Sequence, residues 1–161
     1  MLRIITDSAS DITKPEAEKL NVEVIPMVVR FGENEFLDGV DLSSQQFFEK
    51  LIESRELPKT SQINSFRFGE IFEKYKGDEI VCITLSKKLS GTYQNACIAA
   101  SDFPNVHVID SENVTAGEKI LVQLACRLRD ENKGAKEITN AASEVTDAIN
   151  SVKVDKIIKG K

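Results

Sequence analysis

Three hydroxyl side chains and a glycine lie close together near the middle of the sequence. Ser86, Ser90 and Thr92 fall within one short stretch, and Gly91 stands between the last two. An apolar run at 80–85 precedes them and a helix-compatible run begins near Thr92, so the stretch is predicted to be a strand-to-helix turn. Free N–H groups and the helix dipole favour anions at such a turn, and glycine lets a ligand approach the backbone. The stretch therefore predicts a binding site for a carboxylate or a phosphate.

The same residue types also occur in turns that bind nothing. Serine and threonine are favoured helix N-caps, and glycine is favoured in turns. The turn alone leaves a purely structural role open, so the rest of the chain must decide between the two interpretations.

Signatures of common enzymes and metal sites are absent from the sequence. There is no G-x-G-x-x-G after a predicted strand, no Walker A motif and no G-x-S-x-G. The only histidine, His107, alternates with valines in a strand pattern, which indicates a structural or surface role and gives a catalytic triad or a zinc site little support. Asp7 with Asp11 or Asp110 leaves a magnesium site open, although aspartate is common in turns. We expect no catalytic residue, no metal and no cofactor.

Composition places the chain among ordinary globular domains. Its 161 residues suffice for one domain with its own core, and the net charge of −5 argues against non-specific nucleic-acid binding. Cys82, Cys97 and Cys126 are widely spaced and are predicted to be buried thiols in a reducing compartment. No apolar run is long enough to span a membrane, and a cytoplasmic location is expected.

Strands and helices are predicted to alternate along the chain. Capping boxes start helices at Thr13 and Ser43, Pro26 indicates an edge or a bulge, and Pro58 favours a loop over 57–62. The expected strands cover 2–6, 22–31, 36–39, 80–85 and 106–109, and the expected helices start near Thr13, Ser43, Ser65, Thr92, Val114 and Ile138. This order predicts an α/β fold with a mostly parallel sheet flanked by helices on both faces.

Helical periodicity also predicts which apolar side chains share one face of a helix. In the helix that follows Ser43, the four apolar residues are expected on one face: Phe47, Phe48, Leu51 and Ile52. The helix that follows Ser65 is expected to end at Gly77, and the helix from Val114 is expected to end before Gly134.

Polar turns that follow different strands are predicted to meet. In a parallel sheet, the carboxyl ends of all strands reach the same edge, which brings together the turns 7–11, 86–92 and 110–113. Thr60 and Ser61 are expected to reach this edge from their own loop. The edge would then carry many hydroxyl and amide donors, with Lys87 and Lys88 as its cationic side chains.

Five short segments carry a resemblance to a known family. They are Ile-Thr-Asp-Ser-Ala-Ser-Asp at 5–11, Val-Ile-Pro at 24–26, Lys-Thr-Ser-Gln at 59–62, Leu-Ser-Gly-Thr-Tyr-Gln at 89–94 and Val-Ile-Asp-Ser at 108–111. With these motifs in this order, residues 1–150 resemble the amino-terminal α/β domain of the DegV family. Members normally have a second domain, which is expected to be absent here, and 151–161 is expected to be a basic tail.

The resemblance implies a bacterial fatty-acid-binding protein that is not an enzyme. A long-chain fatty acid would be bound through its carboxylate and presented to a separate fatty-acid kinase. Carried over by motif, Thr60 and Ser90 would hold the carboxylate. Secondary contacts would come from Ser8, Ser61, Gly91 and Thr92.

Two other functions stay open at this stage. A missing second domain would expose an apolar face, so a homo-oligomer is possible, and the chain could be a truncated interaction or oligomerisation module that binds no lipid. The third possibility is a small hydrolase or phosphotransferase with Ser90 as nucleophile, which lacks an identifiable base nearby in the sequence.

Overall fold

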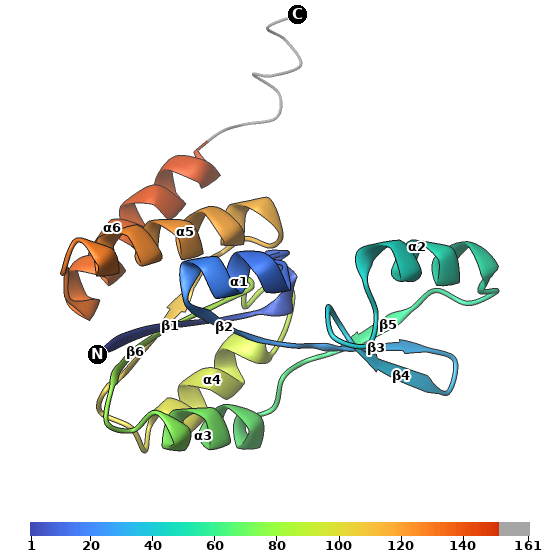
Figure 1. Ribbon diagram of the computed structural model, residues 1–161, viewed down its shortest axis with the longest axis horizontal. Helices are drawn as coiled ribbons and strands as arrows, with labels where there is room; N and C mark the ends of the chain where they lie inside the picture. Colours follow the sequence, from blue (N-terminus) through green and yellow to red (C-terminus); the bar gives the residue numbers. More distant parts are fainter. Residues whose placement is uncertain (152–161) are drawn as a thin grey trace, which may run out of the picture.

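The computed structural model describes residues 1–151. It contains a four-stranded parallel sheet with helices on both faces and a smaller three-stranded antiparallel sheet to one side (Figure 1). The predicted α/β fold with a mostly parallel sheet is confirmed. The predicted basic tail at 151–161 lies outside the described residues except for Ser151.

The parallel sheet has the strand order β2-β1-β6-β7. Its strands are β1 (Leu2–Asp7), β2 (Val22–Ile25), β6 (Glu79–Thr84) and β7 (Val106–Asp110). Ile4 is in register with Val22 on one side and with Val81 on the other. From β1 the next strand, β2, is added toward one edge of the sheet, whereas from β6 the next strand, β7, is added toward the other edge. The boundary between β1 and β6 is therefore the topological switch point, where α/β sheets bind ligands.

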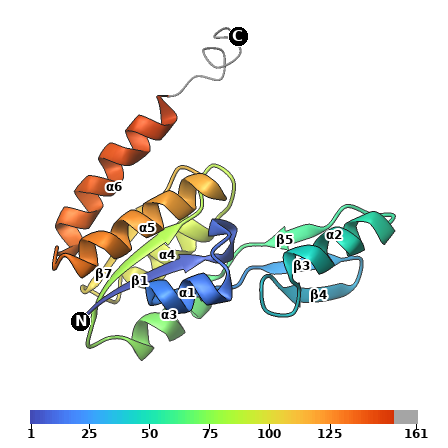
Figure 2. The same ribbon diagram turned by 45° about the horizontal axis from the view of Figure 1, so that its top comes forward.

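Both faces of the parallel sheet are buried because successive apolar residues point to opposite sides. Ile4 and Val81 belong to the core on one face, and Ile5 and Cys82 belong to the core on the other. The first core lies under α1 (Lys14–Leu20), α5 (Ala116–Asp130) and α6 (Ala135–Asn150), and the second lies under α3 (Ser65–Lys74) and α4 (Thr92–Ala100). Figure 1 shows these two layers above and below the sheet, and Figure 2 shows the smaller antiparallel sheet beside the parallel sheet from a second direction.

Residues 28–61 form a small lobe. It consists of the antiparallel strands β3 (Val28–Phe31), β4 (Asn34–Leu37) and β5 (Lys59–Ser61), together with α2 (Ser44–Glu53). The short strand predicted at 36–39 corresponds to β4, which forms an antiparallel pair with β3. The lobe extends to one side of the parallel sheet (Figure 1). It has its own core around Val29, Phe31 and Leu42.

Two predictions for the small lobe are wrong. The single strand expected at 22–31 is divided, because Pro26 lacks an N–H donor and the chain leaves the parallel sheet there to enter the antiparallel one. The loop expected at 57–62 contains strand β5, which pairs with β3. Pairing with a strand distant in sequence stabilises this segment, and local residue preferences do not report it.

The predicted apolar face of α2 is only partly buried. Phe47 and Leu51 pack on the lobe core, whereas Phe48 is 60% exposed and Ile52 is 84% exposed. The thin lobe therefore covers only one narrow stripe of this apolar face.

Both predicted capping boxes are present, at Thr13 with Glu16 and at Ser43 with Gln46. The N-cap of α3 is Asn64 and not Ser65, since the Asn64 side chain accepts a hydrogen bond from the N–H of Arg67.

The other differences from the sequence expectations concern helix ends and cysteines. Helix α3 ends at Lys74, ahead of Gly77, α5 begins two residues after Val114, and α6 begins three residues ahead of Ile138. All three cysteines are free thiols; Cys82 and Cys126 are buried, but Cys97 is only partly so.

Thr115, at the start of α5, has the unusual backbone angles φ 54° and ψ −123°. A β-branched residue is strained in this region, whereas glycine is not. We expect Thr115→Gly to raise the free energy of unfolding by about 1 kcal/mol. This is the relieved backbone strain minus the cost of the extra conformational entropy that glycine gives the unfolded chain. Urea denaturation measures this change. Thr115→Ala keeps the strain, so a stabilisation by alanine equal to that by glycine would contradict the explanation.

Candidate functional site

Hydrogen bonds join the three polar turns at the carboxyl edge of the parallel sheet. The N–H of Leu85 donates to Asp7 Oδ2 at 2.8 Å, and the N–H of Ser86 donates to the carbonyl of Asn113 at 2.9 Å. The N–H of Thr115 donates to the carbonyl of Ala9 at 2.8 Å. The predicted convergence of these turns is therefore confirmed.

Ser90 and Thr92 form the turn that opens α4. Ser90 Oγ accepts a hydrogen bond from the N–H of Thr92 and lies 2.9 Å from Thr92 Oγ1. Thr92 Oγ1 accepts from the N–H of Ile63 at 3.3 Å, and Asn95 Nδ2 donates to the carbonyl of Ile63 at 2.9 Å. The segment that leaves the small lobe is thus fastened to the first turn of α4.

The first turn of α4 presents free backbone donors. The N-cap, Gly91, supplies no side-chain hydrogen bond, and none of residues 1–151 accepts from the N–H groups of Tyr93 or Gln94. These groups lie at the positive end of the helix dipole, beside the half-buried Ser90 hydroxyl. Together they are suited to bind an anion.

Gly91 lies against a side chain from the segment that leaves the small lobe. A Cβ atom at this position would lie 2.2 Å from Gln62 Oε1 and 2.9 Å from Gln62 Cδ. The glycine predicted to admit a ligand therefore admits the Gln62 side chain in this structure. Gln62 itself was not singled out by sequence reasoning, because its contact with Gly91 joins residues far apart in the chain.

Thr60 and Ser61 are both exposed on β5, but they lie on opposite faces of it. Thr60 pairs with Val29, whose side chain is in the lobe core, and Ser61 pairs with Val28 on the other face. The side chain of Thr60 therefore lies on the face of β5 that carries the lobe core, and that of Ser61 lies on the opposite face.

Ser8 and Ser86 are buried hydroxyls with structural partners. Ser8 Oγ accepts from the N–H of Met27 at 2.9 Å, which holds the exit of β2 against the turn after β1. Ser86 Oγ accepts from the N–H of Lys88, and its carbonyl accepts from the N–H groups of Leu89 and Ser90. Ser86 thereby shapes the turn that carries Ser90.

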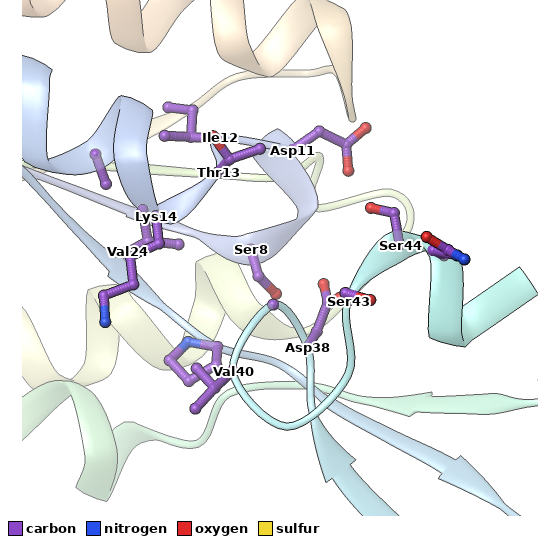
Figure 3. A pocket seen from close by; sticks show the side chains of 14 residues that line it. Ser8, Asp11, Ile12, Thr13, Lys14, Val24, Asp38, Val40, Ser43 and Ser44 are labelled. Atoms are coloured by element: carbon purple, nitrogen blue, oxygen red, sulfur yellow. The ribbon is translucent and has the colours of Figure 1, made fainter.

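A cavity of about 620 Å³ lies between α1 and the loop that leads into α2 (Figure 3). Its apolar wall includes Val24, Pro26 and Val40, and Asp11 and Asp38 contribute carboxyl groups. Among the predicted site residues only Ser8 lines it. The cavity is therefore separate from the free N–H groups of α4.

Asp7 and Glu118 form a buried carboxyl pair that sequence reasoning missed. Asp7 is 1% exposed and Glu118 is 0% exposed. Asp7 Oδ1 and Oδ2 accept from the N–H groups of Ala9 and Leu85, and Glu118 Oε1 accepts from the Thr6 hydroxyl. Burial, together with the Asp7 charge, raises the pKa of Glu118 far above the usual carboxyl range.

The other acidic residues at the edge have separate roles. Burial, followed by the nearby Asp38 charge, raises the pKa of Asp11. Asp110 Oδ1 accepts from the N–H groups of Lys87 and Glu112, as a turn former does. Among residues 1–151 no three histidine, cysteine, aspartate or glutamate side chains come together in a group that could hold a metal ion.

Two further observations concern the rest of the described chain. His107 lies in β7 with its side chain 40% exposed and its Nε2 3.5 Å from Glu79 Oε1, in agreement with the surface role expected of it. No helix within residues 1–151 has the length and apolar character needed to cross a membrane.

Comparison with known proteins identifies relatives along nearly the whole chain. A family model described as "Uncharacterised protein, DegV family" matches residues 1–154. A DegV domain-containing protein of Clostridium acetobutylicum is 40% identical over 99% of this chain and 60% of its own length. One from Clostridium perfringens is 34% identical with the same coverage. The chain thus spans about 60% of the length of these relatives.

Solved structures give the same result. The fold matches a fatty-acid-binding DegV family protein of Thermus thermophilus with a TM-score of 0.83 and 27% identity, over 90% of this chain and 53% of that one. It matches a stearic-acid-binding protein of Eubacterium ventriosum with a TM-score of 0.80 and 29% identity, over 89% and 52%. With the family match over residues 1–154, these likenesses show that the chain belongs to the DegV family.

Proposed function

We propose that this chain is the carboxylate-binding part of a long-chain fatty-acid carrier. The observation that supports this most directly is the pair of free N–H groups at the start of α4, next to the Ser90 hydroxyl. The Thermus thermophilus and Eubacterium ventriosum relatives are described as fatty-acid-binding proteins, which supplies the class of ligand. A fatty-acid carboxylate is an anion of the size that a helix N-terminus accepts.

Ser90 is the proposed principal donor. Thr92 Oγ1 already accepts from the N–H of Ile63, so its own proton is free to be donated to Ser90 Oγ, 2.9 Å away. The Ser90 proton then remains available for the ligand. Thr60 is proposed to donate to the carboxylate from the β5 side.

A carrier role also agrees with the partners of Ser90. Its only side-chain partner among residues 1–151 is the Thr92 hydroxyl, which is no general base. Nothing in this arrangement activates Ser90 as a nucleophile, so the hydrolase or phosphotransferase alternative is disfavoured.

The hydrocarbon part of the ligand needs an apolar wall, since burial is worth about 0.8 kcal/mol per CH₂ group. This chain corresponds to about 60% of its curated relatives, so we propose that part of that wall comes from outside residues 1–151. Presentation to a fatty-acid kinase is the proposed next step. The half-buried Ser90, beside the 65% exposed Leu89, would leave the head group accessible to such an enzyme.

Native mass spectrometry of the purified protein, followed by denaturing extraction, tests the proposal. We expect a copurifying long-chain fatty acid, or saturable binding of one added to the delipidated protein. A folded protein that neither retains nor binds fatty acid would overturn the carrier function for this chain.

The register of β5 makes a sharper prediction about Thr60. We expect Thr60→Val to weaken fatty-acid binding about tenfold or more, because it removes a hydrogen bond to a charged group while keeping the side-chain shape. Ser61→Ala is the matched control and should change the dissociation constant less than about threefold, since Ser61 faces the other way. Isothermal titration with palmitate compares the two. Equal losses of affinity in the two variants would contradict a specific hydrogen bond from Thr60 to the carboxylate.

An interaction module is the second candidate function, and the small lobe is the observation that favours it. Phe48, Ile52 and Leu57 are between 60% and 84% exposed, which is unusual for large apolar side chains on one lobe. Sedimentation of the protein with and without fatty acid would reveal self-association. Concentration-dependent oligomers in a protein that binds no lipid would favour this function over the carrier.

A further inference from the structure

The carboxyl groups of Asp7 and Glu118 meet inside the protein without a cation. Among residues 1–151, no ion pair includes either of them. Glu118 Oε2 receives no N–H or O–H donor from the described residues, although it is fully buried next to Asp7. Two buried carboxylates in contact cannot both remain charged.

The surroundings decide which of the two carries the proton. Burial raises the pKa of Asp7, but its two backbone N–H donors act in the opposite direction and favour its charged form. Glu118 accepts only from the Thr6 hydroxyl, which leaves Oε2 free to carry a proton and donate it. The other titratable groups that act on the pair are Asp11, in the turn after β1, and the buried Cys82 thiol on β6, and neither supplies a positive charge.

We propose that Glu118 is a positioning residue: it stays protonated at neutral pH and donates to the Asp7 carboxylate, which fixes the two turns around the fatty-acid head group. Asp7 binds the N–H of Ala9, next to Ser8, and the N–H of Leu85, which leads into the turn that carries Ser90. Helix α5 thereby sets the orientation of the carboxylate that joins the two turns. The positioning role rests on the proposed function, whereas the protonation does not.

The proton makes folding depend on pH in a definite direction. In the unfolded chain Glu118 loses its proton near pH 4.3 and in the folded chain it keeps it, so the native state binds more protons above that pH. The stability that this proton contributes is fully present below the pKa of Glu118 in the unfolded chain, and it is lost as the pH rises through the pKa in the folded chain. One extra proton raises the unfolding equilibrium constant by up to tenfold per pH unit between about pH 5 and pH 9.

Urea denaturation across this pH range is the first test. Glu118→Gln keeps a neutral donor but has no proton to lose. We expect its unfolding equilibrium constant to lack the rise, of up to tenfold per pH unit, that Glu118 causes in the wild type. Glu16→Gln is the matched control. Glu16 is exposed, and its hydrogen bond with Lys119 lowers the pKa of Glu16 to about 2. Removal of this carboxyl group should therefore leave the pH dependence of the stability above pH 5 unchanged. An unchanged slope in Glu118→Gln would refute the protonated glutamate.

Fatty-acid titration of the same variants tests the positioning. Glu118→Gln should bind within about threefold of the wild type, whereas Glu118→Leu, which cannot donate to Asp7, should bind at least tenfold more weakly while circular dichroism shows a folded protein. Equal binding by both variants would refute the positioning role. If the wild type binds no fatty acid, the proposed function fails, and the urea experiment still decides the protonation. If Glu118→Leu does not fold, Thr6→Val takes its place in this test, because it removes the hydroxyl that orients Glu118. Thr6→Val should weaken fatty-acid binding. Wild-type affinity in Thr6→Val would refute the positioning role.

Discussion

Replacing Ser90 with alanine is expected to weaken fatty-acid binding by roughly ten- to a hundredfold. A hydrogen bond to a charged group contributes about 1.5–3 kcal/mol, and every 1.4 kcal/mol is a factor of ten. The loss should be large because the Thr92 hydroxyl, 2.9 Å from Ser90 Oγ, also loses its partner. Titration of delipidated protein with palmitate measures the change.

Ser101→Ala is the matched control for Ser90→Ala. Ser101 lies at the opposite end of α4, where its exposed hydroxyl donates to the carbonyl of Ile98 at 2.7 Å. Its removal should leave fatty-acid binding unchanged. If Ser90→Ala binds as tightly as Ser101→Ala does, the head group does not contact the start of α4, and the cavity beside Ser8 becomes the next place to test.

The second large effect is expected on stability, from Asp7→Ala. The substitution leaves the part-buried N–H of Ala9 and the buried N–H of Leu85 without their acceptor. Each orphaned donor costs about 1–3 kcal/mol, so the free energy of unfolding should fall by about 2–6 kcal/mol. Since domains of this size are stable by only about 5–15 kcal/mol, the variant should be marginal at room temperature.

Urea denaturation of Asp7→Ala is best compared with that of Asp41→Ala. Asp41 accepts one backbone hydrogen bond, from the N–H of Leu37 to Oδ2 at 2.9 Å, whereas Asp7 accepts two, and Asp41 lies in an exposed loop. Water can replace that acceptor, so the loss should stay below about 1 kcal/mol. Similar losses in the two variants would mean that burial of the Asp7 carboxylate does not determine its contribution.

The two large predictions concern the same edge of the sheet through different physical effects. Ser90 is expected to act on the ligand, because its proton remains free, whereas Asp7 is expected to act on the backbone, because both its oxygens are occupied. A variant of Ser90 should lose less stability than a variant of Asp7, because only one backbone N–H, that of Thr92, loses its acceptor, whereas a variant of Asp7 should lose stability before any effect on binding can be measured. Measurement of both quantities on both variants separates the two roles.

Sequence periodicity was sufficient for most of the parallel sheet and its helices. The buried strand β6 (Glu79–Thr84) is a mostly apolar run, and capping boxes at Thr13 and Ser43 mark helix starts through local hydrogen bonds. The convergence of polar turns also followed from the sequence, since the carboxyl ends of parallel strands share an edge. These features depend on residues close together in the chain, which is why local patterns report them.

The division of 22–31 into two strands in different sheets depended on long-range pairing. Pro26 indicated an irregularity, but only the pairing of Val29 with Thr60 shows that the second half belongs to the small lobe. The same pairing turns the expected loop at 57–62 into a strand and places Thr60 and Ser61 on opposite faces. Strand pairing joins residues about thirty positions apart, and no local pattern records the partner.

Some residues of the candidate site could be found from the sequence, and others only from the tertiary structure. Ser90, Gly91 and Thr92 could be recognised in the sequence because a strand-to-helix turn is a local structure with a local anion-binding geometry. Gln62 could not, because its contact with Gly91 joins residues far apart in the chain. Glu118 could not, because a glutamate in a helix is ordinarily exposed. Only the tertiary structure brings Gln62 against Gly91 and encloses Glu118 beside Asp7, where exclusion of water turns an ordinary carboxyl group into a buried proton donor.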